Sequence, residues 1–141
     1  MWNGAIPLKK KDKFSIIVPC YNEEQTLPIF YDEITKVAKE MKSVDFEFLF
    51  VNDGSKDQTL DILRELSSRD KRVRYISFSR NFGKEAGMYA GLENATGDYV
   101  AIMDADLQDP PSMIDVMYHH IVEDGYDCVA LCSPNHKGYS K

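Results

Sequence analysis

Four short apolar runs, each followed directly by polar residues, most limit the folds open to this chain. They lie at residues 14–19, 46–51, 73–78 and 99–103. Runs of this length, rich in β-branched and aromatic residues, are typical of strands. The run at 14–19 is almost continuously apolar, as expected of a strand buried on both faces, and Pro19 should end it. The run at 73–78 alternates apolar and polar residues, so we expect a less buried strand there.

Segments with helical spacing of apolar residues separate these runs. Helices are predicted at 26–41, 55–66, 84–95 and from 109 onward. The first should open at Thr26. Ser55 and Gln58 have the spacing of a capping box, which predicts that the second helix begins there. Asp109 is expected to cap the fourth helix, directly before a proline in its first turn.

The order of these elements predicts the fold class. With a further apolar run at 128–132 as a fifth strand, the order strand then helix repeats four times and ends on a strand. Such alternation implies an α/β fold with a mainly parallel sheet, right-handed crossovers and helices on both faces. We therefore expect one domain at 14–132, preceded by an N-terminal arm at 1–13 and followed by a polar tail at 133–141.

Three glycines in line, one directly before the third predicted helix and two within it, indicate a close approach of the helix backbone. Gly83, Gly87 and Gly91 recur at intervals of four. Interior glycine costs roughly 0.5–1 kcal/mol relative to alanine, so a compensating contact is expected. That contact is either with the sheet, which we favour, or with a bound ligand.

Composition narrows the class of partner and the compartment. The net charge of −6 gives no general attraction to nucleic acid or to an anionic membrane, so no nucleic-acid partner is expected. A phosphate-bearing ligand must then be held by a local arrangement of residues.

Cys20, Cys128 and Cys132 lack zinc-ligand spacing and favour free thiols in a reducing, cytoplasmic setting. No apolar run of about 18 residues occurs, so no membrane span is expected.

The polar clusters that follow the strands predict a binding site. They are residues 21–23, 52–55, 80–84 and 104–108. In open parallel sheets, ligands bind beyond the carboxyl ends of the strands, near the point where strand order reverses. Four separate segments therefore deliver polar residues to one edge of the sheet.

The last of these clusters has the composition of a metal site. In an extended chain, Asp104, Asp106 and Gln108 point the same way while Ala105 and Leu107 point back. Oxygen ligands of this kind suit Mg²⁺, which takes one or two carboxylates and completes its shell with water and substrate phosphate. An isolated Asp-x-Asp pair is more often a solvated loop, and the three other clusters are what favour the metal site here.

The loop after the first strand narrows the class of ligand that the site can bind. Neither the G-x-G-x-x-G pattern of dinucleotide-binding domains nor the G-x-x-x-x-G-K-[ST] of phosphate-binding loops is present. The loop carries Tyr21, Glu23 and Glu24 instead, which suit stacking and hydrogen bonding to a base and a ribose. A diphosphate would then be bound by a metal on the acidic segment, with Arg80 or Lys84 assisting.

Five segments together form a more specific pattern. They are IVPCYNEE at 17–24, VNDGSKD at 51–57, RNFGKE at 80–85, TGDY at 96–99 and DADLQDPP at 104–111. In this order they resemble the inverting family 2 glycosyltransferases, most closely the polyprenyl-phosphate branch with its bactoprenol glucosyltransferases and dolichol-phosphate mannosyltransferases. The resemblance covers about residues 14–131 and implies the nucleotide-diphospho-sugar transferase fold, which is the Rossmann-like GT-A fold.

The resemblance also implies roles for individual residues. The positions matching the family's nucleoside pocket are Pro19, Tyr21, Glu23, Val51 and Asp53. Among them, Asp53 is expected to hydrogen-bond the base. Asp104, Ala105 and Asp106 match the segment at the donor diphosphate, and the implied ligands of Mg²⁺ or Mn²⁺ are Asp104, Asp106 and Gln108. Arg80 and Lys84 match a further donor-site segment, although Arg80 is equally well read as a structural ion-pair partner.

The implied reaction is in-line attack of an acceptor oxygen on the anomeric carbon of a UDP- or GDP-sugar, with inversion. The metal, held by the catalytic carboxylates Asp104 and Asp106, would offset charge on the leaving diphosphate. A polyprenyl phosphate acceptor is already largely ionised near neutral pH and needs little help from a general base. The full-length protein would then act at the cytoplasmic face of a membrane.

Two departures from the family pattern bear on function. Family members continue well beyond the fifth strand, so the chain resembles a C-terminally truncated, donor-binding half of a longer enzyme. Relatives also carry arginines after that strand, where residues 132–136 read CSPNH. Nucleotide binding is therefore the safer expectation for this chain alone.

Three other functions are alternatives to lipid-linked sugar transfer. A non-catalytic sugar-nucleotide-binding module and a glycosyltransferase acting on a saccharide hydroxyl both stay open. A nucleotidyltransferase should carry a glycine-rich basic loop after its first strand, and residues 19–24 argue against one.

An exposed fifth strand can also favour pairing between two copies of the chain, which would give a homo-oligomer.

Overall fold

The computed structural model describes residues 11–123 of the chain. The predicted fifth strand at 128–132, the polar tail at 133–141 and most of the arm at 1–13 lie outside these residues. Strands and helices alternate as predicted, in the order β1 (Asp12–Cys20), α1 (Leu27–Glu40), β2 (Val44–Asn52), α2 (Thr59–Arg69), β3 (Val73–Ser77), α3 (Lys84–Asn94), β4 (Tyr99–Ile102) and α4 (Met113–Glu123). None of the four helices is long and apolar enough to cross a membrane.

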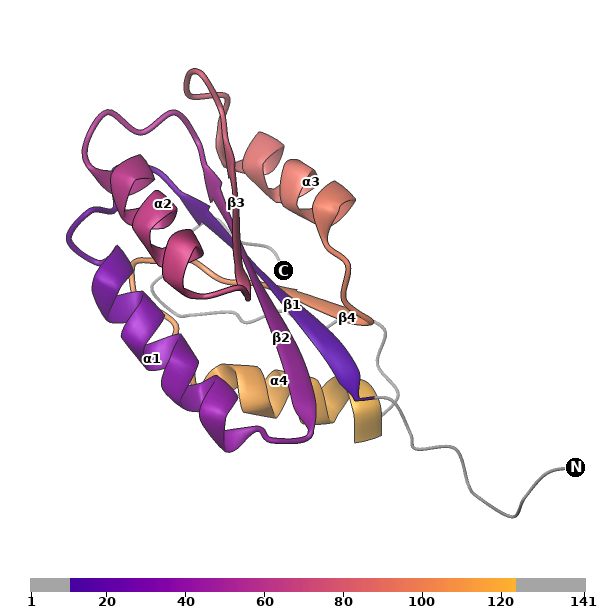
Figure 1. The fold of residues 1–141 in the computed structure, drawn as a ribbon. Coiled ribbons are helices and arrows are strands. Elements are labelled where there is room, and N and C mark those ends of the chain that lie inside the picture. The colour runs from indigo at the N-terminus through magenta and orange to yellow at the C-terminus, as the bar shows by residue number, and fades with distance from the viewer. Residues whose placement is uncertain (1–10, 124–141) are drawn as a thin grey trace, which may run out of the picture.

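The strands form one parallel sheet in the order β3-β2-β1-β4 (Figure 1). β1 is central and is buried along nearly its whole length, as its apolar sequence predicts. It continues one residue past Pro19, to Cys20, which pairs with Asn52 of β2. Pairing with β4 stops earlier, at Ile17 and Ile102, because Pro19 has no N–H to offer the next residue of β4. β3 is an edge strand of this sheet and is mostly exposed, as its alternating pattern predicts.

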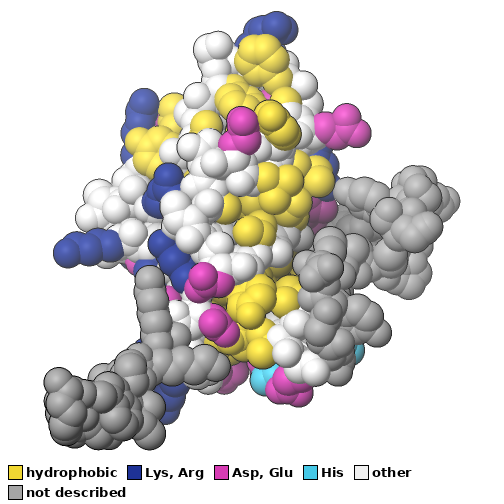
Figure 2. Space-filling view, turned by 90° about the vertical axis from the view of Figure 1, so that its right-hand side faces the viewer, with side chains coloured by type: hydrophobic (Ala, Val, Ile, Leu, Met, Phe, Trp, Pro, Cys, Tyr) yellow, Lys and Arg dark blue, Asp and Glu magenta, His cyan; other side chains and the backbone are white. Residues whose placement is uncertain are grey.

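Helices cover both faces of the sheet, which confirms the predicted layering (Figure 1). One face carries Phe14, Ile16 and Val18 of β1 and packs against α1, α2 and α4 in a single apolar core. The opposite face carries Ile17 of β1 and Val51 of β2, which lie against the glycines of α3. Figure 2 looks onto the side of the molecule that carries α3 and β4, along which hydrophobic side chains gather.

Two helices begin later than predicted. The Ser55 hydroxyl does not cap α2, because it accepts a hydrogen bond from the Asn22 amide at 2.9 Å, across two loops. Asp57 instead accepts a bond from the amide of Thr59, the first residue of α2, at 2.9 Å. At the fourth helix, residues 110–112 form turns, with Met113 N donating to Pro110 O at 2.9 Å. α4 therefore begins at Met113 and not at Asp109.

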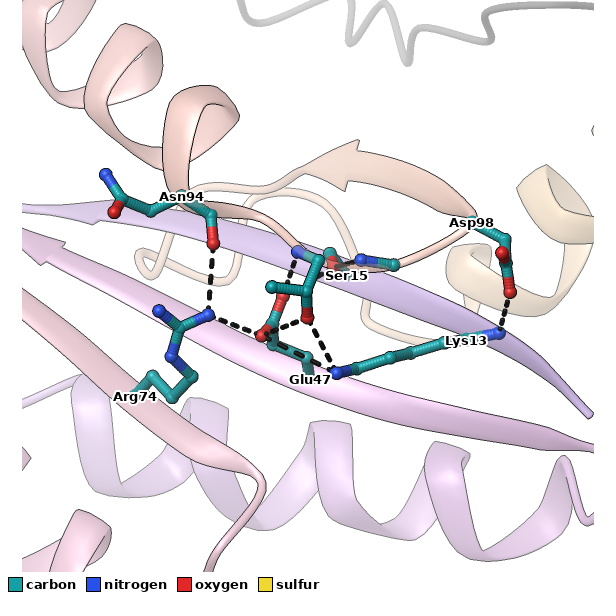
Figure 3. A network of polar contacts seen from close by, with 8 residues as sticks. Lys13, Ser15, Glu47, Arg74, Asn94 and Asp98 are labelled. Carbon is teal, nitrogen blue, oxygen red and sulfur yellow. Dashed lines mark hydrogen bonds and ion pairs between the residues drawn. The ribbon is translucent and has the colours of Figure 1, made fainter.

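A buried carboxylate joins the strands at the end of the sheet where β1 begins (Figure 3). Glu47 of β2, only 3% exposed, accepts hydrogen bonds from the Ser15 hydroxyl at 2.6 Å and from Arg74 at 2.6 Å. The Thr96 amide and hydroxyl, which follow α3, each donate to it at 2.9 Å. Burial alone would raise the pKa of Glu47, but these bonds outweigh it and lower the pKa to about 2.

The glycine contacts of α3 predict opposite results at two neighbouring positions. A Cβ at Gly91 would lie 2.4 Å from Cγ2 of buried Ile17, whereas at Gly87 the nearest atom, Val51 Cγ1, would be 3.6 Å away. Gly91→Ala should lower the free energy of unfolding by about 1–3 kcal/mol through overpacking. Gly87→Ala should be neutral or stabilising by up to about 1 kcal/mol, because alanine favours the helix. Urea unfolding of both variants checks this, and equal effects would contradict it.

The Glu47 cluster predicts a loss of stability in acid. A pKa near 2 against an ordinary 4.5 means that the unfolded chain binds this proton more tightly. The contribution is therefore fully present above pH 4.5, on the order of 3 kcal/mol, and is lost as pH falls toward 2. Glu47→Gln should remove much of this slope and lower stability at pH 7 by about 3 kcal/mol.

Urea unfolding at a series of pH values measures both effects of Glu47→Gln. Glu65→Gln, which breaks a surface pair with Arg69, is the matched control and should change stability by less than about 0.5 kcal/mol. Asp70, whose pKa the neighbouring Arg72 lowers to about 2, keeps a part of the slope in both variants. An unchanged slope in Glu47→Gln would refute the assignment.

Candidate functional site

A cavity of about 200 Å³ opens at the carboxyl ends of the strands. Its lining comes from the end of β1, from the loops after β1, β2 and β4 and from the start of α3. The lining residues are Pro19, Cys20, Tyr21, Glu23, Asp53, Lys84, Asp104 and Asp106. Strand order reverses here, because β1 leads to β2 on one side and has β4 on its other side. The prediction that strand-end clusters meet at this edge is confirmed.

The loop after β1 is tied to the loop after β2. The Asn22 amide donates to the Ser55 hydroxyl at 2.9 Å, and the Lys56 amide donates to Asn22 Oδ1 at 2.8 Å. The Glu23 amide donates to the Thr59 hydroxyl at 2.9 Å. Asn22 has a φ of +52°, a conformation that asparagine tolerates better than most residues. The loop is thus held in one shape, with the ring of Tyr21 at the cavity and 43% exposed.

Asp53, which directly follows β2, holds the loop before α3. One of its carboxylate oxygens accepts a hydrogen bond from Phe82 N at 2.7 Å, and the other accepts one from Gly83 N at 3.0 Å. Gly54 has a φ of +70°, and a Cβ there would lie 2.2 Å from the backbone carbon of Arg80. Only glycine therefore allows these two loops to approach so closely.

Lys84 is the first residue of α3, and its position follows from that contact. Gly83 precedes it with a φ of +103°, which is accessible to glycine at little cost. The Lys84 ammonium lies 2.7 Å from Oδ1 of Asp104, which follows β4. An ion pair thus bridges the cavity between the start of α3 and the acidic segment.

The acidic segment is a turn, so the prediction of an extended chain there is wrong. β4 ends at Ile102, and Leu107 has a φ of +66°. The Gln108 amide bends back to donate to Asp106 Oδ1 at 3.1 Å. Asp104 and Asp106 still line the cavity, while the Gln108 side chain is exposed and is not part of the lining.

Three further predicted residues do not line this cavity. Val51 and Ala105 are fully buried, and Ala105 is part of the core beneath the turn. Arg80 lines a second cavity of about 720 Å³ beside Lys56, and its guanidinium lies 4.2 Å from the centre of the Phe82 ring. Tyr21 contributes to both cavities. The structure therefore separates Arg80 from Lys84.

Cys20 also lines the cavity, whereas the sequence predicts only a free thiol there. Its position between Pro19 and Tyr21 was the available signal. Burial raises the pKa of Cys20, and the charges of Glu23 and Asp104 raise it further, so the thiol stays protonated near neutral pH.

Negative charge dominates the cavity, which carries four carboxylates and one ammonium group among its lining residues. Burial raises the pKa of Glu23, against a hydrogen bond from the Thr26 hydroxyl that lowers it; the charges of Asp106 and Asp104 raise it further. No group of three or more His, Cys, Asp or Glu side chains within residues 11–123 is arranged to hold a metal ion. Two aspartates and a partly buried glutamate nevertheless give oxygen donors of the kind that hard divalent cations prefer.

Comparison with known proteins agrees with this geometry. Residues 15–140 match the family described as Glycosyl transferase family 2. The bactoprenol glucosyl transferase of Shigella phage SfX is 47% identical over 102 residues, which are 72% of this chain and 33% of that protein. The uncharacterized glycosyltransferase YkcC of Bacillus subtilis is 44% identical over 126 residues, covering 89% of this chain and 38% of that protein. The chain thus spans between a third and two fifths of the length of these relatives.

Solved structures show the same fold. The mannosyltransferase PcManGT from Pyrobaculum calidifontis, in complex with GDP-Man and Mn²⁺, has a TM-score of 0.59 and is 25% identical, over 69% of this chain and 28% of that one. Mannosyl-3-phosphoglycerate synthase from Rubrobacter xylanophilus has a TM-score of 0.64 at 22% identity, over 79% of this chain and 36% of that one. The parallel α/β sheet is of the GT-A kind, and the chain belongs to glycosyl transferase family 2.

Proposed function

We propose that this chain binds the nucleotide-diphospho-sugar donor of a glycosyltransferase that transfers the sugar, with inversion, to a polyprenyl phosphate. The observation that carries the proposal is the meeting of Tyr21, Asp53 and the pair Asp104 and Asp106 in one cavity at the switch point of the sheet. The complex of PcManGT with GDP-Man and Mn²⁺ supports a nucleotide-sugar donor and a divalent metal. The relatives named bactoprenol glucosyl transferase support a lipid-phosphate acceptor and, for the whole protein, association with a membrane, for which we propose the cytoplasmic face.

The nucleoside is assigned to the part of the cavity beside β1 and β2. The half-exposed ring of Tyr21 offers a stacking surface, and Pro19 and Glu23 flank it. Each Asp53 oxygen accepts one backbone hydrogen bond and keeps a second lone pair, which can accept from an N–H of the base. Val51, two residues before Asp53, and Ala105, between the two aspartates at the diphosphate side, are buried, so we expect them to support the donor site from the core and not to contact the donor.

The diphosphate and its metal are assigned to the acidic side of the cavity. Asp104 and Asp106 are the ligands that the geometry supports, and Mg²⁺ or Mn²⁺ bound there would neutralise charge on the departing diphosphate. Gln108 is exposed and has less support as a third ligand. Lys84 provides a cation within the same cavity, whereas Arg80 lies in the neighbouring one and packs on Phe82.

The acceptor side explains why no general base is assigned. A phosphate monoester has a second pKa of about 6 and is largely ionised near neutral pH, so its oxygen attacks without prior proton removal. The residues of this chain then have to bind and orient the donor and to stabilise the leaving group. Asp98 and Asp109 are not assigned as bases, since Asp98 accepts a hydrogen bond from the Lys13 amide beside β1 and Asp109 lies outside the cavity lining.

Calorimetric titration of UDP and GDP, with and without Mn²⁺, tests this proposal. One of the two should bind in the presence of Mn²⁺ and bind much more weakly without it. Asp104→Asn and Asp106→Asn should each weaken the Mn²⁺-supported affinity by at least about tenfold, since each removes a charged ligand. Asp61→Asn is the matched control, because Asp61 forms only an exposed pair with Arg64, and it should bind like the wild type.

Binding that is independent of Mn²⁺, or equal in all three variants, would overturn the metal assignment. Transfer of labelled sugar to a polyprenyl phosphate is then measured in the full-length protein, with a saccharide acceptor alongside. Transfer to the saccharide alone would overturn the assigned acceptor and leave the donor site in place.

A further inference from the structure

Lys84 is the only cationic side chain among the described residues that line the acidic cavity. It lies opposite Glu23, Asp53, Asp104 and Asp106. Its ammonium nitrogen is 2.7 Å from Asp104 Oδ1, with the lysine side chain 42% exposed and the aspartate side chain 21% exposed. A carboxylate assigned to the metal is thus already paired with a cation that belongs to the protein.

The backbone that carries Lys84 is held on both sides. Asp53 holds the amides of Phe82 and Gly83 directly before it. Along α3, Gly91 packs against Ile17 so closely that a Cβ would lie at 2.4 Å. The long lysine side chain is 42% exposed, so a change of rotamer can move its ammonium group within the cavity while the backbone keeps its place.

A metal bound at Asp104 would compete with this ammonium group for the same carboxylate. In the free protein, Lys84 offsets the negative charge that four carboxylates bring to the lining of the cavity. A divalent cation held by Asp104 would be repelled by an ammonium group left a few ångströms away. Binding of the metal would therefore favour a position of Lys84 away from Asp104.

We propose that Lys84 is a built-in counter-ion, which pairs with Asp104 in the free protein and passes to the donor diphosphate when the metal takes its place. This inference rests on the proposed function and adds a direction to it: Lys84 weakens metal binding by the free protein and strengthens nucleotide binding by the metal-loaded protein. Because the diphosphate gives the displaced ammonium a new partner, metal and nucleotide favour each other's binding. By linkage, each raises the affinity of the other by the same factor.

The test is the variant Lys84→Met, which keeps the length of the side chain and removes its charge. Mn²⁺ affinity of the protein without nucleotide is read from the electron paramagnetic resonance signal of free Mn²⁺ and by calorimetry. It should tighten by roughly three- to tenfold in Lys84→Met, since a partly exposed ion pair and the repulsion of the metal are both removed. Affinity for UDP or GDP at saturating Mn²⁺ should weaken by a similar factor.

Two variants accompany it. Lys84→Arg keeps the charge and should stay within about twofold of the wild type in Mn²⁺ affinity. Lys36→Met removes a lysine paired with Glu33 on the surface of α1 and should change neither affinity. Thermal unfolding of each variant confirms that the fold is intact, and opposite shifts in the two affinities cannot come from a general loss of structure.

The outcomes separate this inference from the function on which it rests. If the wild type binds Mn²⁺ and Lys84→Met binds it equally or more weakly, the proposed counter-ion role of Lys84 is refuted. The proposed metal site is not affected by that result. If neither protein binds Mn²⁺, with or without nucleotide, the metal site falls and the inference falls with it. Tighter Mn²⁺ binding with unchanged nucleotide affinity overturns the transfer of Lys84 to the diphosphate.

Discussion

The contact on which the site depends is that of the Asp53 carboxylate with the amides of Phe82 and Gly83. Asp53 follows β2, whereas the two amides belong to the loop that enters α3, so this contact joins two elements that are not adjacent along the chain. It determines where α3 begins and therefore where Lys84 points. Without the Asp53 contact, the backbone of Lys84 would not be held in the position from which its side chain pairs with Asp104 across the cavity.

A second carboxylate completes the hold on α3 from its other end. Glu47 of β2 accepts hydrogen bonds from Thr96, just after α3, and from Arg74, which also donates to the Asn94 carbonyl at the last turn of that helix (Figure 3). Glu47 of β2 and Asp53, which directly follows β2, thus hold the two ends of α3. Among the described residues, α3 is the only helix on that face of the sheet. Because both ends of α3 are held, the helix stays against the sheet, which fits the close packing of Gly91 on Ile17.

Much of the fold could be predicted because the pattern of apolar residues is strong. β1 is buried on both faces and reads as a continuous apolar run, whereas the edge strand β3 alternates, and each pattern follows directly from how many faces are covered. The helix starts could not be predicted as well. Ser55 has the spacing of a capping residue, yet its hydroxyl accepts a bond from the Asn22 amide, and no local pattern reveals a partner 33 residues away.

For the site, the sequence by itself determined which segments would meet, since parallel strands bring the residues after them to one edge of the sheet. Tyr21, Asp53, Lys84, Asp104 and Asp106 came together as that rule requires. Only the tertiary structure decided which side chains enter the cavity. The turn at Leu107 leaves Gln108 exposed, and the anchored loop before α3 sends Arg80 to the neighbouring cavity. The succession of strands and helices along the chain follows from short-range patterns of apolar residues. The side-chain orientations depend on contacts between loops distant in sequence, which a pattern along the chain does not contain.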